Sequence, residues 1–427
     1  MPVFLLRRLC APAVLAAYLG VPVWAVEPLT LPQAQALAVA RSQQLAANNA
    51  SIAASRHMAV VAGRLPDPVL KLGVENLPVN GPDRLSLSRD FMTMRRIGLS
   101  QELPGPHKRQ LRAERFEREA DRTRAESQLN LATIQRETAI AWIERYYTQQ
   151  MRELVLRQLQ EAELQLQATQ SGFGAGRNSQ ADVFAAQTAL VMLEDRLSQV
   201  DKQDTNAAWM LNRWLGPDAA RSTSGAPPWQ STSLEEGPLN DHILYHPDLA
   251  MLRAEVEAAH TEARLAQANK NADWSIEAMY SQRGSAYSNM VSVGVSIPLQ
   301  WDQKNRQDRE VAAKLAMVDE ARARYEEMRR HHEAELRTLL NEWKTGKTRV
   351  ARHQDALVPL AKRRSEASLT EYRSGKGSLA ATLLARRDEV DARMQALTVE
   401  METARAWAQL NFLIPDHNPA AQRQEKP

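Results

Sequence analysis

Histidine is the residue type in this chain whose spacing first suggests chemistry. His242 and His246 stand one helical turn apart, and His331 and His332 are adjacent. A structural zinc site uses four nitrogen, sulfur or carboxylate ligands. No acidic or cysteine cluster completes either histidine pair, and Pro247, directly after the first pair, is expected to end its helical turn. We therefore interpret these histidines as structural, and predict no bound metal and no cofactor.

Motifs that carry catalysis are missing from the sequence. It contains no Walker phosphate loop, no Gly-x-Ser-x-Gly elbow and no His-Glu-x-x-His pair. The 54 basic residues nearly balance the 51 acidic ones, so the basic excess typical of nucleic-acid binding is absent. We predict a protein that is not an enzyme and binds no nucleic acid.

Two glycine-rich segments are the next candidates. Residues 173–184 read FGAGRNSQADVF, and residues 372–383 read YRSGKGSLAATL. Glycine ends helices because it adopts positive φ without steric cost. The glycines concerned are Gly172, directly before the first segment, Gly174 and Gly176 within it, and Gly375 and Gly377 in the second. Each segment predicts a chain reversal between two helices, with Arg177 in the first turn and Lys376 in the second.

The two reversals belong to a tandem repeat. The segment GLSQELPGPHKRQ at 98–110 is answered by GVSIPLQWDQKNR at 294–306, and LNRWLGPD at 211–218 by LNFLIPD at 410–416. The offset between matched segments changes only from 196 to 199 residues. A duplication of this size suggests an architecture with internal pseudo-symmetry, often a ring.

Residues that alternate with period two predict four strands, two in each half. We expect them near residues 68–77, 94–103, 273–282 and 290–299. In the last strand Val291, Val293 and Val295 alternate with Ser292 and Gly294, a pattern typical of transmembrane β-strands. Four strands cannot close a barrel, and lipid does not tolerate an open sheet edge. We therefore expect oligomerisation, with a trimer of twelve strands as the first choice.

Helix-forming sequence fills the remainder of each half. We expect helices at about 32–63, 107–171 and 178–215, and again at about 239–270, 303–373 and 378–413. Residues 107–171 contain no proline or glycine, and would span about 95 Å at 1.5 Å per residue. The expected organisation is a first repeat at 26–218, a linker at 219–237, a second repeat at 238–416 and a disordered tail at 417–427.

The N-terminus has the composition of a secretory signal peptide. Arg7 and Arg8 precede an apolar stretch at 9–19, and Ala25 provides a small residue for cleavage. We expect residues 1–25 to be removed. The one cysteine, Cys10, lies before that site without the small neighbours of a lipidation motif, so we expect no lipid anchor on the mature chain.

The order helix, two strands, long helix, glycine turn and return helix, given twice, resembles the TolC family of outer-membrane efflux proteins. The segment MRRIGLSQELPGP at 94–106 is similar in particular to the outer-membrane component of heavy-metal RND tripartite efflux systems, of the cobalt-zinc-cadmium and copper-silver types. The resemblance covers about residues 29–415. Many relatives carry a lipidated N-terminal cysteine, which this sequence lacks.

The resemblance implies a mainly α fold with a β-barrel part. It implies a homotrimer in the outer membrane of a Gram-negative bacterium, with twelve strands in lipid and long helical hairpins forming a periplasmic tunnel. The partners implied are an inner-membrane RND pump and a periplasmic adaptor, the membrane fusion protein. The duct would conduct heavy-metal cations passively. Drugs or secreted proteins are alternative substrates, and a periplasmic coiled-coil adaptor or structural protein is the alternative of a different class.

The resemblance also implies roles for particular residues. The two turns would be the tips that dock the adaptor, through Gly172, Gly174, Gly176, Arg177, Gly375 and Lys376. Glu366 stands six residues before the tip aromatic, where the family carries acidic residues at its pore constriction. With Glu371 it would form a threefold carboxylate ring, which favours cations. The competing interpretation is a solvated helix face with local ion pairs of little energetic value.

Overall fold

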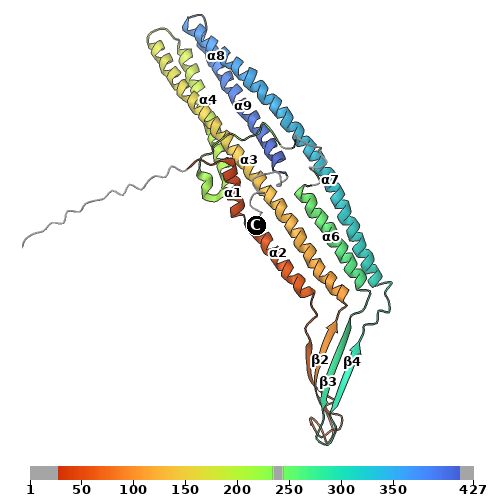
Figure 1. Ribbon diagram of the computed structural model, residues 1–427. Coiled ribbons are helices and arrows are strands. Elements are labelled where there is room, and N and C mark those ends of the chain that lie inside the picture. Colours follow the sequence, from red (N-terminus) through yellow and green to blue (C-terminus); the bar gives the residue numbers. More distant parts are fainter. Residues whose placement is uncertain (1–26, 233, 235–242, 244, 414–427) are drawn as a thin grey trace, which may run out of the picture.

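Four antiparallel strands form one sheet at one end of a long helical bundle, as Figure 1 shows for the computed structural model. The structure describes residues 27–232, 234, 243 and 245–413. The strands are β1 (Val69–Glu75), β2 (Met94–Leu103), β3 (Trp274–Gln282) and β4 (Met290–Ser296), in the spatial order β1-β2-β3-β4. The fold class predicted from the sequence is confirmed: the chain is mainly helical with four antiparallel strands.

The strand register places most apolar residues of the four strands on one face. Leu72 pairs with Ile97, Ile97 with Tyr280, and Tyr280 with Val291. Residues paired across a ladder point to the same side of the sheet. The neighbouring row of pairs, Lys71 with Gly98 and then Met279 with Ser292, therefore lies on the other side. The alternation read in each strand thus describes two continuous faces.

Long helices make up the bundle. They are α1 (Leu31–Arg41), α2 (Gln43–Ala62), α3 (Pro106–Gly174), α4 (Gln180–Leu215), the short η1 (Gly216–Ala220), α6 (Pro247–Ala268), α7 (Gln307–Arg352), the π-helical η3 (His353–Leu357), α8 (Val358–Arg373) and α9 (Leu379–Asn411). Across the described part of the chain, no helix has an apolar stretch long enough to cross a membrane.

Two of the expected helices are interrupted. The helix expected at 32–63 breaks at Ser42, whose backbone is extended and whose hydroxyl accepts a hydrogen bond from the Leu45 amide. Serine competes with the helix in this way because its side chain can cap backbone groups. The helix expected at 303–373 begins at Gln307 and widens into a π-turn just before Pro359. Proline lacks the amide hydrogen that a regular helix requires.

Other boundaries differ only at their ends or lie outside the described residues. The helix expected at 239–270 begins at Pro247, and residues 239–242 and 244 are not described. The expected signal peptide at 1–25 and the expected tail at 417–427 also lie outside the described residues. The limits of the two repeats and of the linker stay predictions.

Three tryptophans bind irregular segments to the centre of the bundle. The indole of Trp142 donates to the Leu29 carbonyl at 3.0 Å, and that of Trp343 to the Trp229 carbonyl at 2.7 Å. Trp407 donates to the carbonyl of Ser231 at 2.9 Å. Buried indole N–H groups need such acceptors. The segments before α1 and after η1 are therefore fastened to the core of the bundle.

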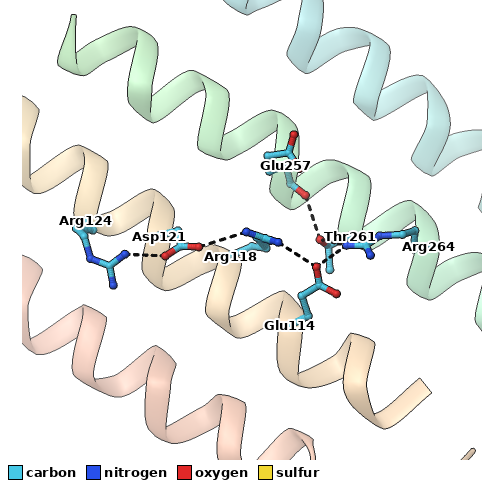
Figure 2. A network of polar contacts seen from close by, with 7 residues as sticks. All are labelled: Glu114, Arg118, Asp121, Arg124, Glu257, Thr261 and Arg264. Atoms are coloured by element: carbon cyan, nitrogen blue, oxygen red, sulfur yellow. Dashed lines mark hydrogen bonds and ion pairs between the residues drawn. The ribbon is translucent and has the colours of Figure 1, made fainter. Parts of the chain in front are cut away.

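Ion pairs join the first repeat to the second along α3 and α6 (Figure 2). The Glu114 carboxylate accepts from Arg118 on its own helix at 3.2 Å and from Arg264 on α6. Burial alone would raise the pKa of Glu114, but the hydrogen bonds from Arg264 and Arg118 outweigh it and lower the pKa. Arg264 also donates to the Thr261 hydroxyl at 2.9 Å. These contacts orient α6 on α3 more than they stabilise the fold, because the arginines remain solvated.

Candidate functional site: the two tips and the sheet

The first tip is the turn between α3 and α4. Its defining contact is the Gly172 carbonyl, which accepts from the amides of Arg177 at 2.8 Å and Asn178 at 3.3 Å. Gly176 has a φ of 68°, which glycine adopts without strain. Helix α4 then begins with the Ser179 hydroxyl accepting from the Asp182 amide at 3.1 Å, as expected of an N-cap.

The second tip, between α8 and α9, repeats this turn. The Glu371 carbonyl accepts from the amides of Lys376 at 2.9 Å and Gly377 at 3.0 Å, and Gly375 has a φ of 76°. Both chain reversals therefore use the same hydrogen bonds, and Figure 1 places both at the end of the bundle away from the sheet.

Positive φ is confined to one glycine in each tip. The sequence led us to expect that all five turn glycines allow positive φ, but Gly172, Gly174 and Gly377 do not adopt it. Glycine is needed at position 172 for a different reason. A Cβ there would lie 2.4 Å from the side-chain nitrogen Nδ2 of Asn178. Nothing lies within 4 Å of a Cβ built on Gly174. The first tip thus needs Gly176 for its backbone and Gly172 for close approach.

Asn178 connects the two tips and was not singled out in the sequence. Its amide nitrogen donates to the Thr169 carbonyl at 3.1 Å, and its amide oxygen accepts from the Tyr372 hydroxyl at 3.1 Å. In the second tip Gly377 occupies the position of Asn178, and Glu371 occupies that of Gly172. The two tips therefore differ at these two positions of the sequence. This difference is the signal that could have indicated that their side-chain contacts differ.

The two cations predicted at the tips are exposed in the structure. Arg177 and Lys376 both lie within the turns. Neither side chain forms an ion pair with any described residue. The tips therefore present two positive charges that are available to a partner.

Glu366 and Glu371 lie on the last turns of α8, and both are exposed. Glu366 pairs with Lys362 at 3.8 Å, one turn earlier on the same helix. The Glu371 carboxylate forms no ion pair within the described part of the chain. One chain does not assemble a carboxylate ring, so the predicted constriction stays a prediction.

The sheet exposes an apolar face that a soluble protein would bury. Leu72 is 71% exposed and Val293 is 77% exposed. Trp274 and Trp301 lie exposed at the end nearest the helices, and Tyr280 lies toward the loops. Large exposed apolar patches mark protein or membrane contacts, and aromatic residues at both borders are typical of a membrane-spanning sheet. This face is suited to lipid.

The opposite face of the sheet is largely polar, and most of its charges are paired. Lys71 forms an ion pair with Glu277, and Arg96 forms one with Glu75. Small residues such as Gly98 and Ser292 lie between them. A face of this composition suits a water-filled interior.

The structure combines one histidine from each pair in the sequence. The rings of His246 and His332 stack with centroids 3.8 Å apart, and both residues are buried. His332 shares hydrogen bonds with Asp248 at 2.9 Å and Glu335 at 3.0 Å. Nδ1 of His246 accepts from the Asp248 amide at 3.2 Å. His242 lies outside the described residues.

The pKa values of the two stacked histidines are shifted in opposite directions. Burial, and then the charge of His332, lowers the pKa of His246 to about 4. Burial would also lower the pKa of His332, but its hydrogen bonds to Asp248 and Glu335 raise it. Within the described ranges, no group of three or more His, Cys, Asp or Glu side chains is arranged to hold a metal ion.

Solved outer-membrane channels share this fold. The CmeC outer membrane channel of Campylobacter jejuni shares this fold with a TM-score of 0.75 at 14% identity, over 90% of this chain and 85% of that one. The MtrE outer membrane channel of Neisseria gonorrhoeae has a TM-score of 0.71 at 14% identity, over 90% and 88%. CusC, solved in a study of transmembrane channel formation, has a TM-score of 0.72 at 13% identity, over 90% and 91%.

The second half of the chain matches a protein-family model. Residues 239–414 match the family described as outer membrane efflux protein. This match covers less than half of the chain, and the likeness to the solved channels is one of fold. No curated protein sequence matches the chain.

Proposed function

We propose that this protein is the exit duct of a tripartite efflux system. In this proposal three copies close a twelve-stranded barrel in the outer membrane of a Gram-negative bacterium, and their helices form a tunnel in the periplasm. The observation that carries the proposal is the four-stranded sheet, which exposes one apolar face and has one largely polar face with two ion pairs.

The edges of the sheet supply the reason for assembly. Within the described residues β1 pairs only with β2, and β4 only with β3. Each unpaired backbone group in lipid costs several kcal/mol. Pairing β1 of one copy with β4 of the next would satisfy both edges and close a ring. The polar face would then line the lumen.

The assembly is tested on the mature chain purified in mild detergent. Light scattering measures the mass of the particle, and planar-bilayer recording measures its conductance. We expect trimers that conduct. A folded monomer that inserts and conducts by itself would overturn the closure of the barrel by three copies.

The partners proposed are a periplasmic adaptor at the tips and an RND pump behind it. The support is that Arg177 and Lys376 are exposed at the far end of the bundle and unpaired among the described residues. The duct is proposed to be passive, with energy supplied by the pump. Reversing both charges should weaken chemical crosslinking to the adaptor encoded with this protein, whereas reversal of Arg56, an exposed arginine of α2, should not. Equal crosslinking by all variants would place docking elsewhere.

Heavy-metal cations are the proposed substrate, on the basis of the resemblance of residues 94–106 and of the acidic residues on α8. A strain that lacks this gene should accumulate particular divalent or monovalent metal ions, measured by mass spectrometry. Restored tolerance to drugs, or restored protein secretion, without any change in metal content would favour the alternative substrates.

A periplasmic adaptor is the competing class. Adaptors also have long helical hairpins, but an adaptor has no need of an exposed apolar sheet such as this one. Membrane fractions distinguish the two. The proposed duct should require detergent for extraction, whereas release by salt or alkali alone would favour the adaptor.

A further inference from the structure

The apolar face of the sheet contains three polar side chains. By register, the strand positions on this face are hydrophobic except for Arg95 and Gln101 on β2 and Gln282 on β3. A charge that faces lipid is costly near the bilayer centre and cheap at the interface. The contacts of these three residues therefore indicate the environment at each end of the sheet.

Gln101 lies at the end nearest the helices, and the protein satisfies it. Its amide nitrogen donates to the Pro66 carbonyl at 2.7 Å and to the Glu102 carbonyl at 2.8 Å. This side chain needs no partner from the membrane.

Arg95 and Gln282 lie at the loop end and differ from Gln101. They are direct cross-strand partners, so their Cβ atoms are about 5 Å apart. Both side chains are exposed. Neither forms a hydrogen bond or ion pair with any described residue. The sheet therefore presents a guanidinium and an amide donor together, without a protein acceptor.

The position of this pair is independent of how the barrel closes. β2 and β3 are the inner strands of the sheet, so neighbouring copies that pair with β1 and β4 leave the face of β2 and β3 open. Tyr280, two residues before Gln282 on the same face, is 42% exposed. Aromatic residues of this kind mark the border between hydrocarbon and headgroups. The pair thus lies at the level of the headgroups.

We propose that Arg95 and Gln282 bind the phosphate of a lipid headgroup in the outer leaflet of the outer membrane. This inference rests on the proposed function, because it needs the apolar face in lipid and the loops outside. Arginine presents parallel N–H donors that match two phosphate oxygens. The Gln282 amide adds a neutral donor beside them. The phosphate supplies the counter-charge that the sheet does not.

Native mass spectrometry of the trimer tests the site. The purified protein is incubated with lipid A, with lipid A from which the phosphates have been removed, and with a zwitterionic phospholipid. We expect wild type to retain phosphorylated lipid A about tenfold better than Arg95→Gln, as the loss of one charge-assisted bidentate contact implies. Gln282→Leu should lose less, and retention should fall with added salt.

Arg56→Gln is the matched control. Arg56 is also exposed and forms no ion pair with described residues, but it lies on α2. The Arg56→Gln variant should retain phosphorylated lipid A as wild type does. Equal retention by wild type and Arg95→Gln, or equal binding of dephosphorylated lipid A, would overturn the site.

Conductance recorded on the same preparations separates the two proposals. Trimers that conduct while Arg95→Gln retains lipid like wild type would remove the phosphate site alone. A wild-type protein that neither inserts nor conducts would remove the proposed function and this inference together.

Discussion

The Tyr372 hydroxyl donates a hydrogen bond to the Asn178 amide oxygen at 3.1 Å, across 194 residues of sequence. One residue belongs to the turn between α3 and α4, and the other lies at the end of α8. The contact joins the tips of two separate hairpins. A partner that docks at the tips would therefore meet one surface whose two halves are held in register.

Removing this contact should loosen the tips without unfolding the bundle. Tyr372→Phe deletes the donor and leaves the Asn178 oxygen to solvent, at a cost of about 1 kcal/mol. We expect faster hydrogen exchange at both turns and weaker adaptor crosslinking. Tyr245→Phe, at an exposed tyrosine outside the tips, is the control and should change neither. Unaltered exchange at the tips in Tyr372→Phe would mean that the contact does not couple the hairpins.

Alanine at two neighbouring glycines should have opposite consequences. Gly172→Ala places a methyl group 2.4 Å from the side-chain nitrogen Nδ2 of Asn178. This clash must displace the Asn178 side chain from Tyr372. Gly174→Ala meets open space at negative φ, and alanine favours the helix by up to about 1 kcal/mol. Thermal unfolding of the tips, followed by hydrogen exchange, should show loss in the first and none in the second. Matching behaviour of the pair would disprove the assigned role of Gly172.

Cysteines placed singly along β4 should report its two faces. Val291, Val293 and Val295 lie on the apolar face, and Ser292 and Gly294 on the polar one. Because the proposed lumen is aqueous, a water-soluble thiol reagent should label 292 and 294 strongly in membranes and the valine positions weakly. All positions should label alike after denaturation. Uniform labelling in intact membranes would be incompatible with a lipid-facing sheet.

The acidic residues of α8 should influence ion selectivity if they line the proposed constriction. Glu366→Gln with Glu371→Gln removes the charge from each copy and keeps a good helix former. Reduced cation selectivity, and weaker blockade by multivalent cations added from the periplasmic side, are expected in planar bilayers. Lys362→Gln, which alters only the partner of Glu366, is the control. Wild-type selectivity in the double variant would assign both carboxylates to the solvated helix face.

The stacked histidines should make the fold sensitive to acid. The pKa of His246 falls from 6.5 to about 4 on folding, so the unfolded chain binds this proton first and stability is lost as pH falls between these values. At pH 5 the loss is about 2 kcal/mol per chain, at 1.36 kcal/mol per pKa unit. His332 acts in the opposite sense: its raised pKa adds stability that is full below pH 6.5 and lost at higher pH. The pKa shift of His246 is the larger of the two, so neutral pH should be more favourable than pH 5 despite the opposite effect of His332.

His246→Asn tests this assignment, because asparagine keeps a helix N-cap acceptor and does not titrate. The drop in Tm between pH 7 and pH 5 should be smaller than in wild type. The charged groups around His246 are Asp248, Glu335 and His332, with Arg136 nearby. The same drop in both proteins would mean that another of these groups carries the acid sensitivity.

Local patterns of residues were sufficient to predict several elements of the fold. Alternation along residues 290–296 predicts a strand with one apolar face, because successive side chains of a strand point to opposite sides. The absence of proline and glycine from 107–171 predicts an uninterrupted helix, and Gly176 and Gly375 predict the two reversals. The strands, the uninterrupted helix and the positive φ of these two glycines are present in the structure.

Contacts between residues far apart in the chain became evident only from the packing of the elements. His246 stacks on His332, which lies 86 residues further along the chain, because α6 packs along α7. Asn178 meets Tyr372 because two hairpins run side by side to the same end of the bundle. Arg95 and Gln282 become neighbours only through the register of β2 on β3. Such contacts depend on packing between elements far apart in the chain, which no local pattern of residues encodes.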